Sequence, residues 1–176
     1  LGLRAAPEER LGHAAAPAMT LIENTLMTSH SEDVVNRWGI INFDNVKEKT
    51  KDIVSEFDVR TPTLDNAAAS LSGGNLQKFV IGREILQKPR VFVVNQPTWG
   101  VDAAAAAFIR QSILNLASQD SAVVVISQDL DELFEICDTF AVLTNGHLSK
   151  SHNIRSLSSK DVGLLMGGSD LDLKKP

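Results

Sequence analysis

The chain is poor in cysteine, in long apolar runs and in clustered basic residues, which argues against several classes of protein. It holds one cysteine, Cys137, which excludes a disulfide framework and a cysteine zinc site and suits a reducing compartment. No apolar run approaches the ~18 residues that cross a membrane. Its 17 Lys and Arg residues are scattered and outnumbered by 22 Asp and Glu, so we expect no nucleic-acid partner. With 43% hydrophobic and 22% charged residues, the composition is that of an ordinary globular protein.

The beginning of the chain also lacks familiar features. Residues 1–10 are mixed and charged, unlike a signal peptide, and the first residue is not Met. We therefore expect the sequence to be a piece of a longer protein. Its 176 residues correspond to one large domain or two small ones.

The first half of the chain is predicted to be mostly helical. Residues 1–30 are expected to be loop-like up to Thr20, where a helix begins with Glu23 three residues later, as in a capping box. An amphipathic helix is predicted over residues 46–57. A stronger helix is predicted over 72–87, with Phe79, Val80 and Leu86 as core residues, and it ends before Pro89.

The second half alternates strands and helices. Residues 91–94 and 122–126 are short all-apolar runs, typical of strands that are buried on both faces. Asp102 and Asp129 are candidate N-caps. This order favours a parallel sheet with helices on its faces. The expected elements are strands at 91–94, 122–126, 139–143 and 147–151, and helices at 103–118, 129–137 and 158–166.

The most informative segment is LSGGNLQK at residues 71–78, where a serine and two glycines precede the long helix. Glycines let the backbone approach a ligand closely. The helix directs its free N–H groups and its positive dipole end toward the same place, which suits a phosphate. Standing alone, a Ser-Gly-Gly sequence before a helix is often only a loop.

Two further segments follow in order, VFVVNQPTWGVD at 91–102 and ISQDLDE at 126–132. With residues 71–78 they resemble the signature, Walker B and switch segments of ATP-binding cassette (ABC) ATPases. PEERLG at 7–12 and QPTWGVD at 96–102 are similar to one subfamily, which energises importers of simple sugars and nucleosides. Those ATPases carry two cassettes in one polypeptide, and this chain resembles the second, C-terminal one.

The resemblance implies an α/β fold: a partial ABC ATPase core of the P-loop type, with parallel strands and flanking helices, plus an α-helical subdomain. Residues 1–30 would hold the lobe-connecting segment and the start of that subdomain. Residues 31–88 would hold the rest of it with the signature, and 89–176 the C-terminal part of the core lobe. Trp38 would pack in the helical subdomain, and residues 25–60 would dock a membrane subunit.

Several of the family's catalytic features are missing. No Gly-Lys pair occurs, so the family's phosphate loop is not among these residues and is expected to precede residue 1. Asn95, at the metal position, and Gln96 replace the Walker B Asp-Glu, while Gln128 replaces the switch histidine. An amide brings no negative charge to Mg²⁺ and cannot act as a base, and losing a general base costs about 10²–10⁴-fold in rate. We expect Gln96 and Gln128 to be degenerate catalytic positions.

Each substitution alone suits an ordinary polar strand end or loop. Engineered changes could also produce Gln96, but amides at three of the family's catalytic positions together favour natural divergence. The parent protein is expected to use ATP and Mg²⁺, whereas this chain alone is expected to bind neither and to be inactive.

In ABC dimers each nucleotide lies between two cassettes. One supplies the phosphate loop, Walker B and switch residues, and the other supplies the signature and the D-loop Asp. The replaced positions are all Walker B or switch residues, whereas the signature and the D-loop Asp are intact. The chain is therefore predicted to complete a site on a partner cassette. The residues expected to bind nucleotide in trans are Leu71, Ser72, Gly73, Gly74, Asn75, Gln77 and Asp102.

The resemblance further implies two partners, the other cassette and transmembrane permease subunits, which would hold the protein peripherally on the cytoplasmic face of the membrane. Trp99 would face the partner cassette or pack in the core. A partial sheet exposes an edge, so a non-native homodimer is also expected. Two alternatives stay open: a non-transport ABC-type ATPase of DNA repair or chromosome maintenance, and an interaction module without nucleotide chemistry. The acidic balance and the short segment between signature and Walker B argue against the first alternative.

Overall fold

The computed structural model describes residues 2–29, 34 and 39–168. The chain forms two compact units, Leu1–Gln128 and Asp129–Pro176. The boundaries expected near residues 30 and 88 stay predictions. Trp38, expected to pack in a helical subdomain, lies outside the described residues.

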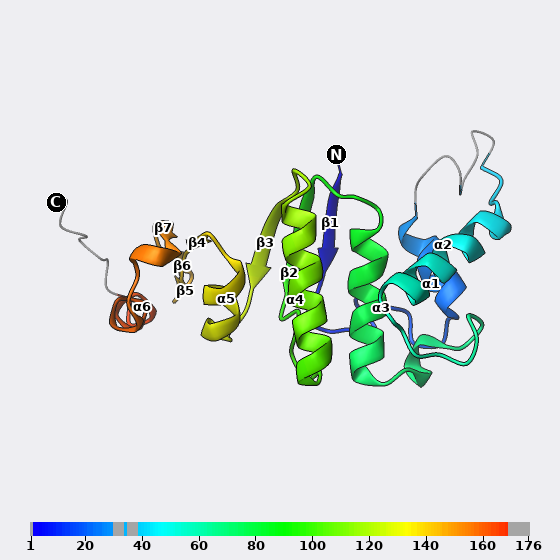
Figure 1. Cartoon of the computed structure of the whole chain (residues 1–176), viewed down its shortest axis with the longest axis horizontal. Coiled ribbons are helices and arrows are strands. Elements are labelled where there is room, and N and C mark those ends of the chain that lie inside the picture. Colours follow the sequence, from blue (N-terminus) through cyan, green and yellow to red (C-terminus); the bar gives the residue numbers. More distant parts are fainter. Residues whose placement is uncertain (1, 30–33, 35–38, 169–176) are drawn as a thin grey trace. The chain divides into compact units, whose positions relative to one another are not determined.

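The first unit is built on a three-stranded parallel sheet in the order β1-β2-β3 (Figure 1). Its central strand is β2 (Val91–Asn95), flanked by β1 (Leu3–Ala6) and β3 (Ala122–Ile126). The predicted α/β fold with parallel strands is confirmed. The prediction of a loop at the start of the chain is wrong for Leu3–Ala6, which form β1. Its four residues carry no periodic signal, and they form a strand because they pair with β2.

In the described part of this unit four helices accompany the sheet, and each begins at a side-chain cap. Thr20 and Glu23 form the predicted capping box. Asn42 caps the second helix, which starts three residues before the predicted position because Asn45 donates its N–H to the Asn42 side chain. The helices are α1 (Leu21–Thr28), α2 (Phe43–Glu56), α3 (Gly73–Ile85) and α4 (Ala103–Ala117), and Ala68–Ser70 form a 3₁₀ turn.

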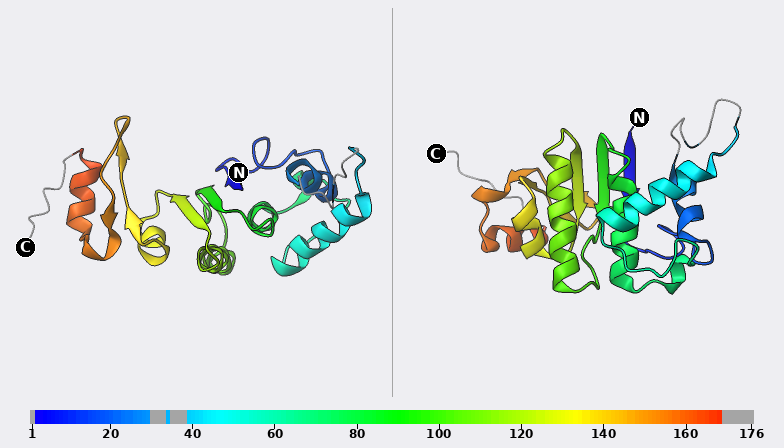
Figure 2. Two further views of the ribbon diagram at one scale, coloured as in Figure 1. Left: turned by 90° about the horizontal axis from the view of Figure 1, so that it is seen from above. Right: turned by 45° about the vertical axis from the view of Figure 1, so that its right-hand side comes forward.

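Helices α3 and α4 lie on one face of the sheet (Figures 1 and 2). Phe92 and Val94 on β2 are fully buried, as expected for side chains on the covered face. On β3, Val124 and Ile126 are 49% and 51% exposed. The prediction that these strands are buried on both faces is therefore wrong for β3, because its exposed side chains have no helix over them.

A close contact joins α2 to the middle of α3. A Cβ atom at Gly82 would lie 2.6 Å from ring atoms of Phe57, so only glycine lets the ring sit against the helix. The same ring packs edge-on against Phe108 of α4, with 5.6 Å between ring centroids. Phe79 and Val80 are core residues as predicted, whereas Leu86 is only half-buried.

The second unit has a small core formed by Phe140, Val142, Ile154, Leu157, Val162 and Leu165. The single strands predicted at 139–143 and 147–151 are wrong, because this segment folds into two short antiparallel pairs. Asn145 and Gly146 both have positive φ and form the predicted turn between the inner pair. The elements are α5 (Leu130–Ile136), β4 (Thr139–Phe140), β5 (Leu143–Thr144), β6 (His147–Leu148), β7 (His152–Asn153), a 3₁₀ turn (Ile154–Ser156) and α6 (Ser159–Met166).

Cys137 follows α5 and is half-buried. Burial raises the pKa of its thiol, and the nearby carboxylates of Glu132 and Asp138 raise it further. A raised pKa keeps the sulfur in its less reactive thiol form. Among the described residues, no helix is both long enough and apolar enough to pass through a bilayer.

Candidate functional site

The predicted catalytic positions meet at one edge of the parallel sheet. Because β1, β2 and β3 run in the same direction, their carboxyl ends share an edge, where α/β proteins commonly bind ligands. Asn95 ends β2 and pairs in register with Ile126 at the end of β3. Gln96 and Gln128 follow those two strand ends, so the fold brings the three amide residues to one edge.

Gln96 occupies a special backbone position at this edge. Its φ is +51°, a left-handed value that is uncommon for a residue with a side chain. Its N–H donates to the Ile126 carbonyl at 2.7 Å, and the residue is only 7% exposed. The turn after β2 is therefore tightly defined. Asn95 is half-buried and Gln128 is exposed.

The signature segment forms the N-terminal end of α3. Ser72 is the N-cap, and its Oγ accepts hydrogen bonds from the Asn75 backbone N–H and from Asn75 Nδ2, the latter at 2.9 Å. Asn75 Oδ1 in turn accepts from the Arg60 N–H at 2.9 Å. Ser72 and Gly73 are exposed, so the first turn of this 13-residue helix faces solvent. Its free N–H groups are available to an anion. Leu71, which precedes the cap, is half-buried.

The segment after β2 lies beside the signature. A Cβ atom at Gly73 would be 3.8 Å from the Gly100 carbonyl oxygen, and one at Gly74 would be 4.0 Å from Val101 Cβ. Asp102 caps α4 by accepting the Ala105 N–H at 2.8 Å and is exposed, as predicted for a cap. The two elements expected to act in trans therefore share one exposed surface, the signature surface, formed by Ser72, Gly73, Trp99, Gly100 and Asp102.

Trp99 resolves one open alternative, since its side chain is 64% exposed. Core packing is therefore wrong for this residue. An exposed tryptophan on the signature surface is a feature that protein interfaces favour. Its role toward a partner cassette stays a prediction.

Gln77 lies behind the signature surface and is 2% exposed. Its Oε1 accepts a hydrogen bond from Arg10 Nε at 2.7 Å, and its Nε2 donates to the Pro97 carbonyl at 2.8 Å. Arg10 also donates from Nη2 to the Trp99 carbonyl. Because the Gln77 amide is enclosed and engaged within the chain, its position suits support of the signature rather than direct contact with a nucleotide.

Arg10 is the residue at this site that the sequence analysis did not single out. Burial lowers the pKa of its half-buried guanidinium, which nevertheless stays protonated at any ordinary pH. The available signal was its place in PEERLG, immediately after the carboxyl end of β1. Its partners are 67 and 89 positions away in sequence, so no local pattern reveals them.

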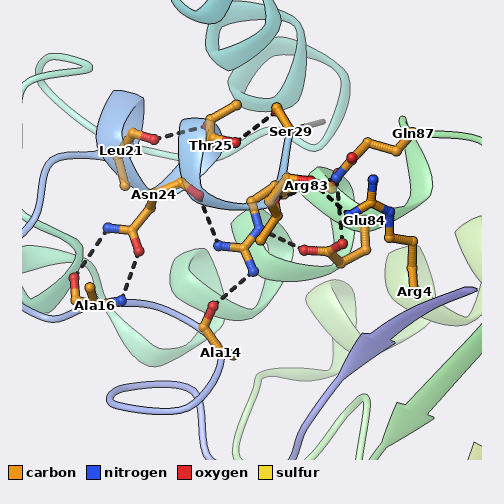
Figure 3. Close-up of polar contacts among 11 residues, drawn as sticks. Arg4, Ala14, Ala16, Leu21, Asn24, Thr25, Ser29, Arg83, Glu84 and Gln87 are labelled. Atoms are coloured by element: carbon orange, nitrogen blue, oxygen red, sulfur yellow. Dashed lines mark hydrogen bonds and ion pairs between the residues drawn. The ribbon is translucent and has the colours of Figure 1, made fainter. Parts of the chain in front are cut away.

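A buried polar network ties the middle of α3 to α1 and to the loop before it (Figure 3). Arg83 pairs with Glu84 at 2.7 Å and donates to the backbone carbonyls of Asn24 and Ala14 at 3.2 and 2.7 Å. The Asn24 side chain in turn bonds both the N–H and the carbonyl of Ala16. Arg83 and Glu84 are 4% and 2% exposed, so each charge depends on its partner.

No family model matches the chain. It is 32% identical over 168 residues to the guanosine import ATP-binding protein NupO of Bacillus subtilis. It is 31% identical over 166 residues to the nucleoside import ATP-binding protein NupA of Lactococcus lactis. It is 33% identical over 161 residues to the galactose/methyl galactoside import ATP-binding protein MglA of Mannheimia succiniciproducens. These alignments cover 96%, 94% and 92% of the chain, which spans only 33%, 33% and 32% of the relatives.

Solved structures agree on the fold. A metal-chelate type ABC transporter in an inward-facing conformation matches with a TM-score of 0.74 at 18% identity, over 94% of this chain and 64% of that one. A dimeric ATP-binding cassette bound to ADP and phosphate matches with a TM-score of 0.68 at 16% identity, over 89% and 65%. The motifs, the fold and the relatives together show that the chain belongs to the ATP-binding cassette family, in the group of sugar and nucleoside import ATP-binding proteins.

Proposed function

We propose that this chain is part of the ATP-binding subunit of an importer for a simple sugar or nucleoside. Within that subunit it presents its signature surface to a nucleotide held by the other cassette. The observation behind this proposal is the closeness of the two segments: Gly73 lies beside the Gly100 carbonyl and Gly74 beside Val101. Ser72, Gly73, Gly100 and Asp102 are all exposed. The positions for in-cis catalysis carry amides instead.

The signature surface offers what a triphosphate needs from a second cassette. The first turn of α3 supplies free N–H groups and a positive dipole end, and Gly73 and Gly74 leave room for the phosphate to approach. Ser72 adds a hydroxyl at the same place. These groups stabilise negative charge without themselves carrying out proton transfer, so they suit a site that assists hydrolysis begun elsewhere.

The residues present do not fit a Mg²⁺ ion held in cis. Asn95 offers a neutral amide at the family's metal position, which brings no negative charge to the ion. Across residues 2–29, 34 and 39–168, no group of three His, Cys, Asp or Glu side chains could hold a metal. The Asn95 amide is the observation that supports placing Mg²⁺ on the partner's side of the paired site.

We also propose that residues 25–60 dock a permease subunit, which would hold the protein on the cytoplasmic face of the membrane. Exposed large apolar residues in the described part of this region include Met27 at 57%, Ile40 at 64% and Phe43 at 59%. Such exposure supports a protein contact. For the isolated chain, a non-native homodimer through the edge strands β1 or β3 stays a prediction.

The decisive test replaces Ser72 with a bulky residue in the full-length protein. Ser72→Arg should lower ATP turnover and solute uptake at least about tenfold, because the side chain blocks the first turn of α3. Ser158→Arg is the matched control, since Ser158 caps α6 in the other unit through the same kind of bond. Both variants lose about 1 kcal/mol of helix capping. Unchanged uptake in Ser72→Arg would show that the chain does not act in trans.

A nucleotide titration of the full-length protein separates this proposal from an interaction module. Binding of ATP that Ser72→Arg weakens and Ser158→Arg leaves unchanged supports the trans role. No ATP binding at any protein concentration contradicts it.

A further inference from the structure

We infer that Arg10 is a positioning residue that locks the signature segment and the segment 97–102 into one rigid surface, so that both meet the partner's nucleotide together. The inference rests on the proposed function. It adds a residue from a third part of the chain, the segment after β1, to the two segments that act in trans.

The guanidinium of Arg10 bonds to both segments at once. Nε donates to Gln77 Oε1 on α3 at 2.7 Å, and Nη2 donates to the carbonyl of Trp99. Gln77 closes the arrangement by donating from Nε2 to the Pro97 carbonyl at 2.8 Å. The three segments therefore share a single cyclic set of hydrogen bonds. Moving one segment against another would break at least one of them.

Two glycines lie against this arrangement. A Cβ atom at Gly73 would lie 3.1 Å from Arg10 Nη1, and one at Gly100 would lie 3.6 Å from Arg10 Nη2. The guanidinium thus sits between the first residue of α3 and the turn after β2. Gly100 has a φ of +64°, which also favours glycine at that turn.

The backbone that carries Arg10 is itself anchored. The Arg10 carbonyl accepts the Ala15 N–H at 2.7 Å, and the Glu9 carbonyl accepts the Ala14 N–H at 3.1 Å. The Ala14 carbonyl is held by Arg83 Nη2 from the middle of α3 at 2.7 Å (Figure 3). The segment after β1 is therefore joined to α3 at two levels, through Gln77 near the signature and through Arg83 two turns later.

The chemistry requires an arginine. Its planar fork directs Nε and Nη2 to separate acceptors in fixed directions, whereas a lysine ammonium is a point charge on a flexible stem. Arg10→Lys keeps the positive charge near the signature but cannot hold Gln77 and the Trp99 carbonyl in the same geometry. This substitution therefore separates positioning from simple charge.

The test measures steady-state ATP turnover of the full-length transporter complex carrying Arg10→Lys. Poorer alignment of the signature should lower kcat about tenfold, and KM for ATP should stay within about twofold, because ATP binds first to the partner cassette. Arg4→Lys is the matched control. It also loses a guanidinium-to-backbone bond, from Arg4 Nη1 to the Thr28 carbonyl at 2.7 Å, but this bond is remote from the signature.

A double variant tests whether Arg10 and Gln77 act as one unit. If Arg10 and Gln77 act together, Arg10→Lys with Gln77→Leu should lower kcat no further than either change alone. Additive losses would overturn the inference. A kcat that recovers fully when the assay is cooled below the unfolding temperature would also overturn it, because the loss would then reflect folding only.

Ser72→Arg, measured in parallel, distinguishes failure of the Arg10 inference from failure of the proposed function. If Ser72→Arg abolishes turnover and Arg10→Lys leaves kcat unchanged, the inference fails and the proposed function stands. If neither variant changes turnover, the trans role itself fails and the inference fails with it. A raised KM with unchanged kcat in Arg10→Lys would mean that Arg10 binds nucleotide directly, which also overturns a positioning role.

Discussion

The signature surface and the catalytic edge of the sheet lie in the same unit, but the chain supports them very differently. Behind the signature surface, Gln77 is 2% exposed and bonds to Arg10 and Pro97, and the Arg83 network follows along the same helix. At the catalytic edge, the replaced positions carry neutral amides, and Gln128 is exposed. The contrast is that enclosed hydrogen bonds support the surface that is proposed to act in trans, whereas neutral amides occupy the edge of the sheet.

The largest expected effect tests the support behind the signature. Arg83→Met should lower the free energy of unfolding by about 3–5 kcal/mol, because it leaves the Glu84 carboxylate buried without its partner. Urea unfolding measures the loss. The double variant Arg83→Met with Glu84→Gln should lose less than Arg83→Met alone. An equal or larger loss would show that the pair is not the source of the stability.

The next largest loss in free energy of unfolding is expected for Gly82→Ala, which destabilises α3 at a position away from the signature segment. The new Cβ would meet the Phe57 ring at 2.6 Å, and such overpacking typically costs about 1–3 kcal/mol. Gly163→Ala in α6 is the control, because no atom lies within 4 Å of its Cβ position. There, removal of a helical glycine should stabilise by about 0.5–1 kcal/mol. Thermal unfolding of the two variants should shift in opposite directions.

A pair of glutamine variants compares the two regions directly. Gln77→Leu leaves Arg10 Nε and the buried Pro97 carbonyl without a partner, which should cost about 1–3 kcal/mol. Gln128→Leu alters an exposed side chain and should change the free energy of unfolding by less than about 0.5 kcal/mol. Similar losses in chemical denaturation would remove the contrast between the signature surface and the catalytic edge.

The smallest expected effect concerns pH. Hydrogen bonds from the Thr20 backbone N–H and hydroxyl lower the pKa of Glu23, which completes the cap of α1. A carboxyl with a lowered folded-state pKa stabilises fully above its ordinary value of 4.5, and the contribution is lost as the pH falls through the folded pKa. Glu23→Gln should therefore weaken the acid dependence of thermal unfolding below about pH 5 without abolishing it. An unchanged pH profile would exclude Glu23 as a contributor.

Local chemistry predicted a good part of the structure. Thr20, Asp102 and Asp129 are N-caps as predicted, because short-range hydrogen bonds define them. The apolar runs around Val94 and Val124 predicted strands, and their order predicted a parallel sheet. What local chemistry missed has few residues or depends on distant pairing. β1 is four residues long, and the strand predicted at 139–143 divides because its two ends pair with different partners.

The sequence alone determined the order of the segments that resemble the signature, Walker B and switch. It also determined the neutral amides at Asn95, Gln96 and Gln128 and the ends of most helices, because each depends on neighbours within a few positions. Only the tertiary structure decided that Trp99 is exposed, that Gln77 is enclosed and that Arg10 joins two segments. Those outcomes depend on contacts across 20, 67 and 89 positions of sequence. Such contacts form when the parallel strands bring their carboxyl ends to one edge, and no local pattern records them.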